Sequence, residues 1–155
     1  MRRFVFSFAA VMNLLLLDQA VKELVLRTMP EGRPLAVIEG FFDITLVRNL
    51  GCAWGMLQGA VWPLAAFGIV AIAVLIWKRD WFFSPGWTGT AGELLLHAGI
   101  LGNLVDRIFR GSVVDMLDFH WGVHHFPVFN VADVYISIAA AILLVTGLFG
   151  DDSGR

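Results

Sequence analysis

Two aspartates separated by 18 positions, Asp115 and Asp133, are the residues of this chain best suited to acid–base chemistry. Asp115 ends the segment Gly111-Ser112-Val113-Val114-Asp115, and Asp133 ends Phe129-Asn130-Val131-Ala132-Asp133, where a long apolar run begins. A carboxylate at or near membrane depth is costly and is usually functional. Two carboxylates that meet can share a proton and activate a water molecule.

The composition indicates a membrane protein. Hydrophobic residues make up 58% of the 155 residues and charged residues only 15%, whereas a soluble domain is about 25% charged. Mean hydropathy is +0.76. The net charge of −2 disfavours a nucleic-acid binder. The single cysteine, Cys52, excludes an internal disulfide and a cysteine-based zinc site.

Four segments are long enough to cross about 30 Å of hydrocarbon. They run over about 4–26, 59–77, 87–108 and 131–149, and we expect one integral-membrane domain over 1–155, mainly α-helical, as a four-transmembrane-helix bundle. The first resembles a signal peptide, but no small-x-small cleavage site follows, so we interpret it as an uncleaved helix. Four spans place both termini on one side and every polar motif at the opposite face.

The orientation in the membrane depends on short basic flanks, because basic residues divide almost evenly between the two sides. Arg2-Arg3 and Lys78-Arg79 favour cytoplasmic termini and motifs at the outer face. The tryptophans fit two interfacial belts, the inner one with Trp77, Trp81 and Trp87 and the outer one with Trp54, Trp62 and Trp121.

Two segments do not span. In the segment over about 30–58, Phe42, Ile44 and Leu46 alternate with other side chains, which predicts short strands on the outer surface. Residues 110–129 are predicted to form a loop rich in aromatic residues and histidine.

Three polar groups each admit a structural and a functional interpretation. Asp18 and Lys22 share a helix face, as a salt bridge or as a wall of a site on which Lys22 contacts a substrate or a neighbouring helix. Asn103, Asp106, Arg107 and Arg110 form one stripe, exposed or packed, and the small residues Ala98 and Gly102 favour packing. Asn130 either caps the last helix or joins Asp133 in a site.

A metal site is not the favoured interpretation of the histidines. His120, His124 and His125 lie near Asp115 and Asp118, but adjacent histidines lack ligand spacing on a regular helix face and no His-x-x-x-His with glutamate occurs. We therefore expect no metal and no cofactor. The pattern does not choose between Asp115 and Asp118. Cys52 is interpreted as a small packing residue.

Five motifs in order resemble the lipoprotein signal peptidases (signal peptidase II), which are bacterial integral-membrane aspartic peptidases. The resemblance covers essentially the whole chain. It is carried by Asp18-Gln19-Ala20-Val21-Lys22, Asn49-Leu50-Gly51-Cys52-Ala53-Trp54-Gly55, Gly102-Asn103-Leu104-Val105-Asp106-Arg107, Gly111-Ser112-Val113-Val114-Asp115 and Phe129-Asn130-Val131-Ala132-Asp133.

The resemblance implies that Asp115, rather than Asp118, forms a catalytic dyad with Asp133. It implies a small extracytoplasmic β-sheet (cradle) and residues that bind substrate or support the site: Asp18, Lys22, Asn49, Gly51, Asn103, Asp106, Arg107, Asn130 and Ala132. Ala98-Gly99 replaces the family's glycine pair, Met116 replaces a phenylalanine, and Cys52-Ala53-Trp54 replaces an Ala-Ala-Phe-like run. These departures concern substrate fit rather than chemistry.

The resemblance also implies a substrate and a place in the cell. The substrate is a diacylglyceryl-modified prolipoprotein, cleaved just before the modified cysteine, at the outer face of the bacterial inner membrane. Membrane lipid and globomycin-like inhibitors are further implied partners, nucleic acid is not, and we expect a monomer. The alternatives are a small proton-coupled transporter or channel subunit, which needs polar groups through the whole membrane depth, and a non-catalytic adaptor.

Overall fold

The computed structural model describes residues 2–52 and 55–149, and it gives side-chain surroundings for 6–52 and 55–148. The elements are α1 (Arg2–Thr28), β1 (Leu35–Ile38), β2 (Phe42–Asn49), α2 (Val61–Trp77), α3 (Arg79–Phe82), α4 (Trp87–Arg110), β3 (Val113–Trp121), β4 (His124–His125) and α5 (Val131–Phe149). The four long helices lie within about two residues of the predicted segments. The sequence predicts where they are because each is a long segment in which apolar residues predominate.

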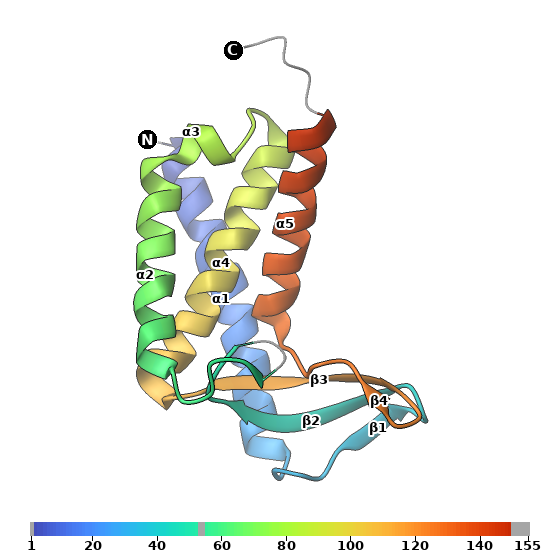
Figure 1. The fold of residues 1–155 in the computed structure, drawn as a ribbon. Coiled ribbons are helices and arrows are strands. Elements are labelled where there is room, and N and C mark those ends of the chain that lie inside the picture. The colour runs from blue at the N-terminus through green and yellow to red at the C-terminus, as the bar shows by residue number, and fades with distance from the viewer. Residues whose placement is uncertain (1, 53–54, 150–155) are drawn as a thin grey trace.

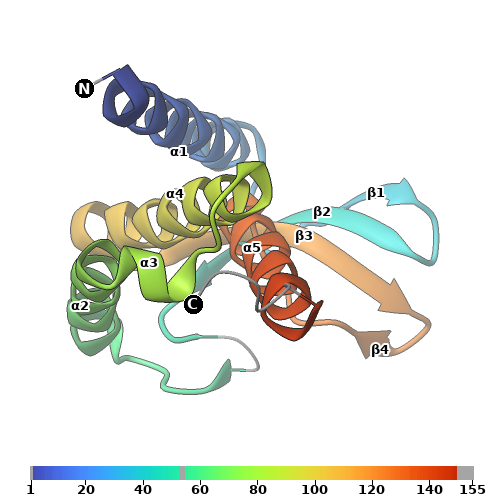
Figure 2. The same cartoon turned by 90° about the horizontal axis from the view of Figure 1, so that it is seen from above.

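The four long helices stand side by side, and the sheet lies across one end of them (Figure 1). Helix α4 is central, in contact with α1, α2 and α5, and the view along the bundle shows the others around it (Figure 2). Short α3 closes the opposite end, where the described chain also starts and stops (Figure 1). The sheet end therefore holds the last turns of α1 and α4 and the first turns of α2 and α5.

Small residues on α4 allow close packing, as the sequence predicts. A Cβ atom on Gly99 would lie 2.5 Å from the carbonyl oxygen of Ala132, and one on Gly102 would lie 2.6 Å from Asp18 Oδ2. Ala98 is fully buried. The backbone at the start of α5 and the Asp18 side chain of α1 therefore lie directly against the same stretch of α4.

The sheet has the order β1-β2-β3-β4 with antiparallel neighbours. Strand β2 lies where the alternation of Phe42, Ile44 and Leu46 predicts it. The prediction that 110–129 is a loop is wrong, because most of it forms β3 and β4. Asp43 pairs with Asp118 and Val47 with Asp115 across the sheet, with an irregularity between Ile44 and Val47. The segment is rich in β-formers, but its partner strand lies far away in the sequence, where local patterns do not show it.

The sheet is anchored to α1 by a small apolar core. Val25 from α1, Leu46 from β2, and Val114 and Met116 from β3 are all buried together. This core fixes the strand that carries Asp115 against the end of the helix that carries Asp18 and Lys22.

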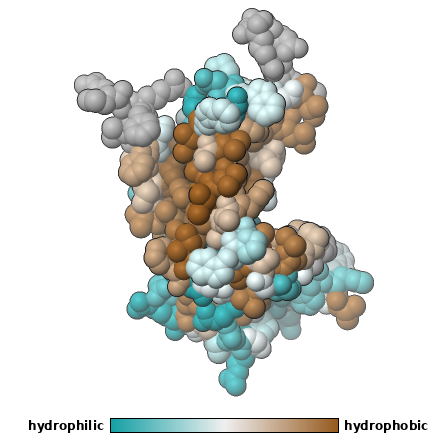
Figure 3. Space-filling model, turned by 60° about the vertical axis from the view of Figure 1, so that its left-hand side comes forward, coloured by the Kyte–Doolittle hydropathy of each residue, from teal (hydrophilic) through white to brown (hydrophobic). Residues whose placement is uncertain are grey.

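The outward surfaces of the helices are apolar. Phe6, Phe67, Trp62 and Leu148 are each between 67% and 71% exposed, and the space-filling view shows a hydrophobic wall over the helices with hydrophilic surface at the sheet end (Figure 3). Among the described residues, one segment meets the length and apolarity of a membrane span, Val131–Leu148, and α2 is apolar with 17 residues. An apolar outer surface with charged groups buried inside is the reverse of the arrangement found in soluble proteins.

The tryptophans divide between the two ends of the bundle. Trp77, Trp81 and Trp87 are all strongly exposed at the α3 end, and Trp62 and Trp121 are exposed toward the sheet end. Trp54 lies outside the described residues. This distribution matches the two belts that the sequence predicts.

Candidate active site

Asp115 lies in the middle of the buried stretch of β3 and is only 2% exposed. Its two carboxyl oxygens accept hydrogen bonds from two side-chain amides. Oδ1 accepts from Asn130 Nδ2 at 2.6 Å, and Oδ2 accepts from Asn49 Nδ2 at 2.9 Å. Neutral donors thus hold a buried carboxyl that makes no salt bridge among the described residues.

Asp133 lies in the first turn of α5 and forms a reciprocal cap with Asn130. Asn130 Oδ1 accepts from the backbone N–H of Asp133 at 3.0 Å, and Asp133 Oδ2 accepts from the backbone N–H of Asn130 at 3.2 Å. The other oxygen, Oδ1, accepts from Asn103 Nδ2 at 2.7 Å. The two interpretations of Asn130 therefore hold together, because it caps the helix with its oxygen and binds Asp115 with its nitrogen.

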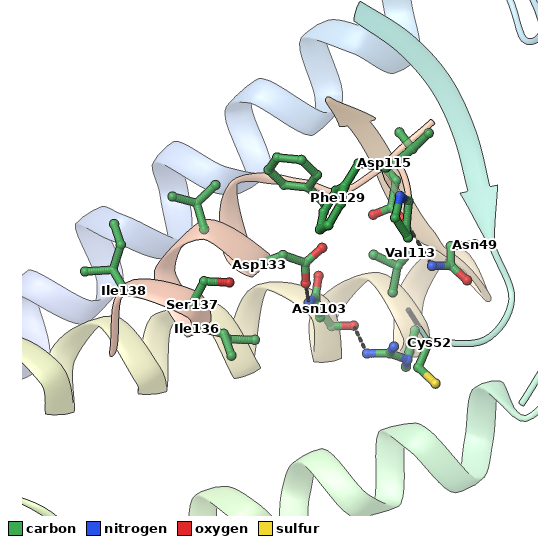
Figure 4. A pocket seen from close by; sticks show the side chains of 15 residues that line it. Asn49, Cys52, Asn103, Val113, Asp115, Phe129, Asp133, Ile136, Ser137 and Ile138 are labelled. Carbon is green, nitrogen blue, oxygen red and sulfur yellow. Dashed lines mark hydrogen bonds between the residues drawn. The ribbon is translucent and has the colours of Figure 1, made fainter. Parts of the chain in front are cut away.

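Asn130 and Asn103 connect the two carboxyls. Asn130 Nδ2 donates both to Asp115 and, at 3.1 Å, to Asn103 Oδ1. Both aspartates are thus bound to Asn130 and lie in one hydrogen-bonded chain. Figure 4 shows the two carboxyls directed into the same cavity.

Burial raises the pKa of Asp115 from 3.8 to about 6, and the nearby charge of Asp133 adds to this effect, while the Asn49 and Asn130 donors oppose it. A carboxyl with this pKa exchanges its proton close to neutral pH. The site therefore satisfies a requirement of general acid–base chemistry.

The cavity has a volume of about 520 Å³ and two kinds of wall. Asp115, Asp133, Asn49, Asn103 and Arg107 supply the polar side. Apart from Cys52, the remaining lining is mostly apolar and comes from β3, the segment before α5 and α5 itself: Val113, Phe126, Pro127, Val128, Phe129, Val134, Ile136, Ser137 and Ile138. This combination fits a ligand with a peptide bond and an apolar portion.

The segment after β2 forms a tight turn at the cavity rim. Asn49 Oδ1 accepts from the backbone N–H of Gly51 at 2.9 Å, and Arg107 donates to the Gly51 carbonyl at 3.1 Å. A Cβ on Gly51 would lie 2.4 Å from the Met56 carbonyl oxygen, so only glycine fits. Cys52 is partly buried and lines the cavity. Ala53 lies outside the described residues.

A second polar cluster lies between α1 and α4 next to the cavity. Lys22 is fully buried and binds Asp18 Oδ2 and Asp106 Oδ2, each at 2.9 Å. Asp106 also pairs with Arg110. Gln19 Nε2 donates to Asp18 Oδ2 at 3.1 Å and to Asp106 Oδ1 at 3.2 Å. Lys22 therefore forms the predicted salt bridge with Asp18 and also contacts the neighbouring helix α4.

Gln19 and Arg110 belong to this cluster, although neither is among the site residues that the resemblance implies. The spacing of four between Asp106 and Arg110 is a usable sequence signal for that pair. No local signal marks Gln19, because its partners on α4 lie more than 80 positions away.

Ala132, beside Asp133, is fully buried, and its backbone N–H donates to Asp18 Oδ1 at 2.9 Å. Its carbonyl oxygen would lie 2.5 Å from a Cβ on Gly99, which shows how tightly this turn is packed.

Asp118 and the histidines lie along the sheet away from the cavity lining. Asp118 bonds His125 Nδ1 at 2.9 Å, His120 Nε2 lies 3.4 Å from Asp43, and the His120 and His125 rings stack at 4.9 Å between centroids. Among the described residues, no group of three or more histidine, cysteine, aspartate or glutamate side chains has the geometry of a metal site.

Comparison with known proteins agrees with the motif pattern. The sequence model of the family described as "Signal peptidase (SPase) II" matches residues 10–149. The "Lipoprotein signal peptidase" of Bacillus pumilus is 35% identical over 90% of this chain and 90% of its own length. That of Geobacter sulfurreducens is 39% identical over 88% of each chain. That of Aeromonas hydrophila is 39% identical over 84% of this chain and 81% of its own.

Two solved structures, both described as bacterial membrane enzymes, share the fold. One has a TM-score of 0.78 and 32% identity, covering 97% of this chain and 91% of its own. The other has a TM-score of 0.75 and 33% identity, covering 94% of both chains. The chain belongs to the signal peptidase II family and is a membrane peptidase of the aspartic type.

Proposed function

We propose that this protein removes the signal peptide of prolipoproteins by hydrolysing the peptide bond just before a diacylglyceryl-modified cysteine. The observation that carries the proposal is one cavity in which two carboxyls, held by shared asparagines, face an apolar wall. The names of the relatives support the substrate class.

Asp115 and Asp133 act as the catalytic pair. One carboxylate takes a proton from a water molecule, which attacks the scissile carbonyl carbon and forms a tetrahedral intermediate. The protonated carboxyl then donates its proton to the leaving amine as the C–N bond breaks. A pKa of about 6 at Asp115 supports a shared proton. The pair titrates as a unit, so neither residue is assigned to one role.

The four long helices cross the bacterial inner membrane with the termini in the cytoplasm and the cavity at the outer face. Their apolar outward surfaces support this placement, and the tryptophans at the two ends of the bundle suit its two interfaces. At the outer interface, acyl chains remain in lipid while the peptide bond reaches the carboxyls. Val134, Ile136 and Ile138 form a wall of the cavity along which such a substrate enters sideways.

The remaining polar groups do not favour the transporter alternative. Glu93 and His97 lie toward the opposite end of α4. Glu93 is paired with Arg79 at 2.6 Å, and His97 Nδ1 bonds the Glu93 backbone carbonyl at 2.7 Å. These contacts are local, and the described residues form a dense polar cluster only at the sheet end.

The test uses the full-length protein purified in detergent with a prolipoprotein peptide, with and without the diacylglyceryl group on its cysteine. We expect cleavage of the lipidated peptide alone, with mass spectrometry placing the cut directly before the modified cysteine. Equal cleavage of the unlipidated peptide would contradict the proposed substrate. A cut elsewhere would contradict the proposed position.

A further inference from the structure

The polar cluster between α1 and α4, here called the Lys22 cluster, consists of Asp18, Gln19, Lys22, Asp106 and Arg110. It is connected to the backbone beside both members of the catalytic pair. Asp18 accepts from the N–H of Ala132, the residue before Asp133, at 2.9 Å. Asp106 accepts from the N–H of Val114, the residue before Asp115, at 3.0 Å. Each carboxylate of the cluster thus holds the peptide next to one catalytic carboxyl.

Lys22 joins these two anchors and has no donor left for a substrate. Its ammonium group has three N–H donors, and the structure gives it three acceptors. These are Asp18 and Asp106 at 2.9 Å each and Asn103 Oδ1 at 3.3 Å. The side chain is fully buried and is not part of the cavity lining. Its effect on the reaction must therefore pass through these partners.

The contact with Asn103 determines which end of that amide faces the catalytic pair. Asn103 Oδ1 accepts from Lys22 and Asn130, which leaves Nδ2 to donate to Asp133 at 2.7 Å. An ammonium group donates and cannot accept. The reversed amide would place NH₂ against two donors and its oxygen against a carboxyl, which is unfavourable at every contact.

We propose that Lys22 is a positioning residue for the catalytic pair, which orients the Asn103 amide toward Asp133 and ties the anchors of Ala132 and Val114 together. The proposal rests on the proposed function of the Asp115 and Asp133 pair. This positioning role differs from a purely structural role, in which Lys22 would only neutralise the buried carboxylates.

A charge-balanced variant separates these two roles. Lys22→Met alone leaves buried carboxylates short of a cation and is expected to fold poorly. In Lys22→Met/Asp18→Asn the cation and one carboxylate are removed together, Asp106 keeps Arg110, and the asparagine oxygen can still accept from Ala132. The orientation of Asn103 by an ammonium is lost.

The experiment measures kcat and KM on the lipidated peptide and the melting temperature in detergent. For the double variant we expect a melting temperature near that of the wild type, a KM within about twofold and a kcat lower by roughly 10- to 100-fold. Adding Asn103→Ala to it should lower kcat little further, because the two changes remove one interaction. Glu93→Gln, which breaks the Arg79 pair at the far end of the bundle, is the control and should leave kcat unchanged.

Three results would overturn the proposal. The first is a wild-type kcat in the double variant. The second is a further drop in kcat, when Asn103→Ala is added to the double variant, as large as the drop that Asn103→Ala causes in the wild type. The third is the loss of folded protein in the double variant as well as in Lys22→Met, which would show a purely structural role. If the wild type itself does not cleave the lipidated peptide, the proposed function fails instead, so the two failures are distinguishable.

Discussion

Two carboxylate pairs lie next to each other at the sheet end of the bundle, and their partners differ in charge. Asp18 and Asp106 bind the cations of Lys22 and Arg110. Asp115 and Asp133 bind asparagine amides and a backbone N–H. The first pair is fully buried, whereas the second lines the cavity. The cations hold the first pair as part of the structure, whereas Asp115, held by neutral donors, has a pKa raised to about 6 by burial and can exchange a proton.

The largest expected effect separates activity from stability at the proposed catalytic pair. Asp115→Asn and Asp133→Asn should each lower kcat by roughly 10²- to 10⁴-fold or more, because each removes a carboxyl to which the proposed mechanism gives a proton transfer. The folded protein should persist in both. Peptide cleavage and melting temperature in detergent test this. Asp118→Asn is the matched control on the same strand, and a loss equal to that of Asp115→Asn would show that the wrong aspartate was chosen.

The opposite result is expected in the cation-bound pair. Asp106→Asn leaves Lys22 and Arg110 with one fewer negative charge, and breaking a buried ion pair costs about 3–5 kcal/mol. The melting temperature should therefore fall, and activity should fall with it. An inactive Asp106→Asn variant with unchanged stability would remove the distinction between the two pairs.

The raised pKa of Asp115 predicts how stability depends on pH. The folded protein holds this proton up to about pH 6, whereas the unfolded chain releases it near 3.8, so this group's contribution to stability is lost as pH rises between these values. The difference corresponds to roughly 3 kcal/mol at neutral pH. Asp115→Asn should thus gain stability relative to the wild type from pH 4 to pH 7 in thermal denaturation. A constant difference across this range would contradict the shift.

The close approach of α1, α4 and α5 is tested by a glycine comparison. Gly102→Ala would place Cβ 2.6 Å from Asp18 Oδ2 and 3.0 Å from the Ala132 Cβ, at a cost of about 1–3 kcal/mol. Gly147→Ala, on α5 with no atom within 4 Å, is the control and should be neutral or slightly stabilising. Equal melting temperatures for the two variants would show that the packing at Gly102 is loose.

The smallest expected effect is that of a chelator. Because the mechanism proposed for the pair uses two carboxyls and water, incubation with EDTA should leave the rate of peptide cleavage unchanged. A loss of activity that added metal restores would contradict this mechanism and indicate a metal site at His120, His124 and His125. Substitution of His124 would then identify the ligand set.

The sequence by itself determined the helices and which polar motifs share one end. Long apolar runs and helix periodicity are local properties, so they can be predicted from neighbouring residues. Ordered motifs also identified the family, and the resemblance predicts Asp115 rather than Asp118 as the catalytic residue, a choice that spacing alone left open.

Only the tertiary structure decided how those motifs meet. It placed Asp115 on a strand rather than in a loop, gave Asn130 two roles, and paired Lys22 with Asp106 and Asn103. These contacts join residues up to 114 positions apart, such as Ala132 and Asp18. Such contacts depend on how closely helices and strands approach each other. Small residues such as Gly99 and Gly102 allow a close approach, but the sequence around them does not show which helix packs there.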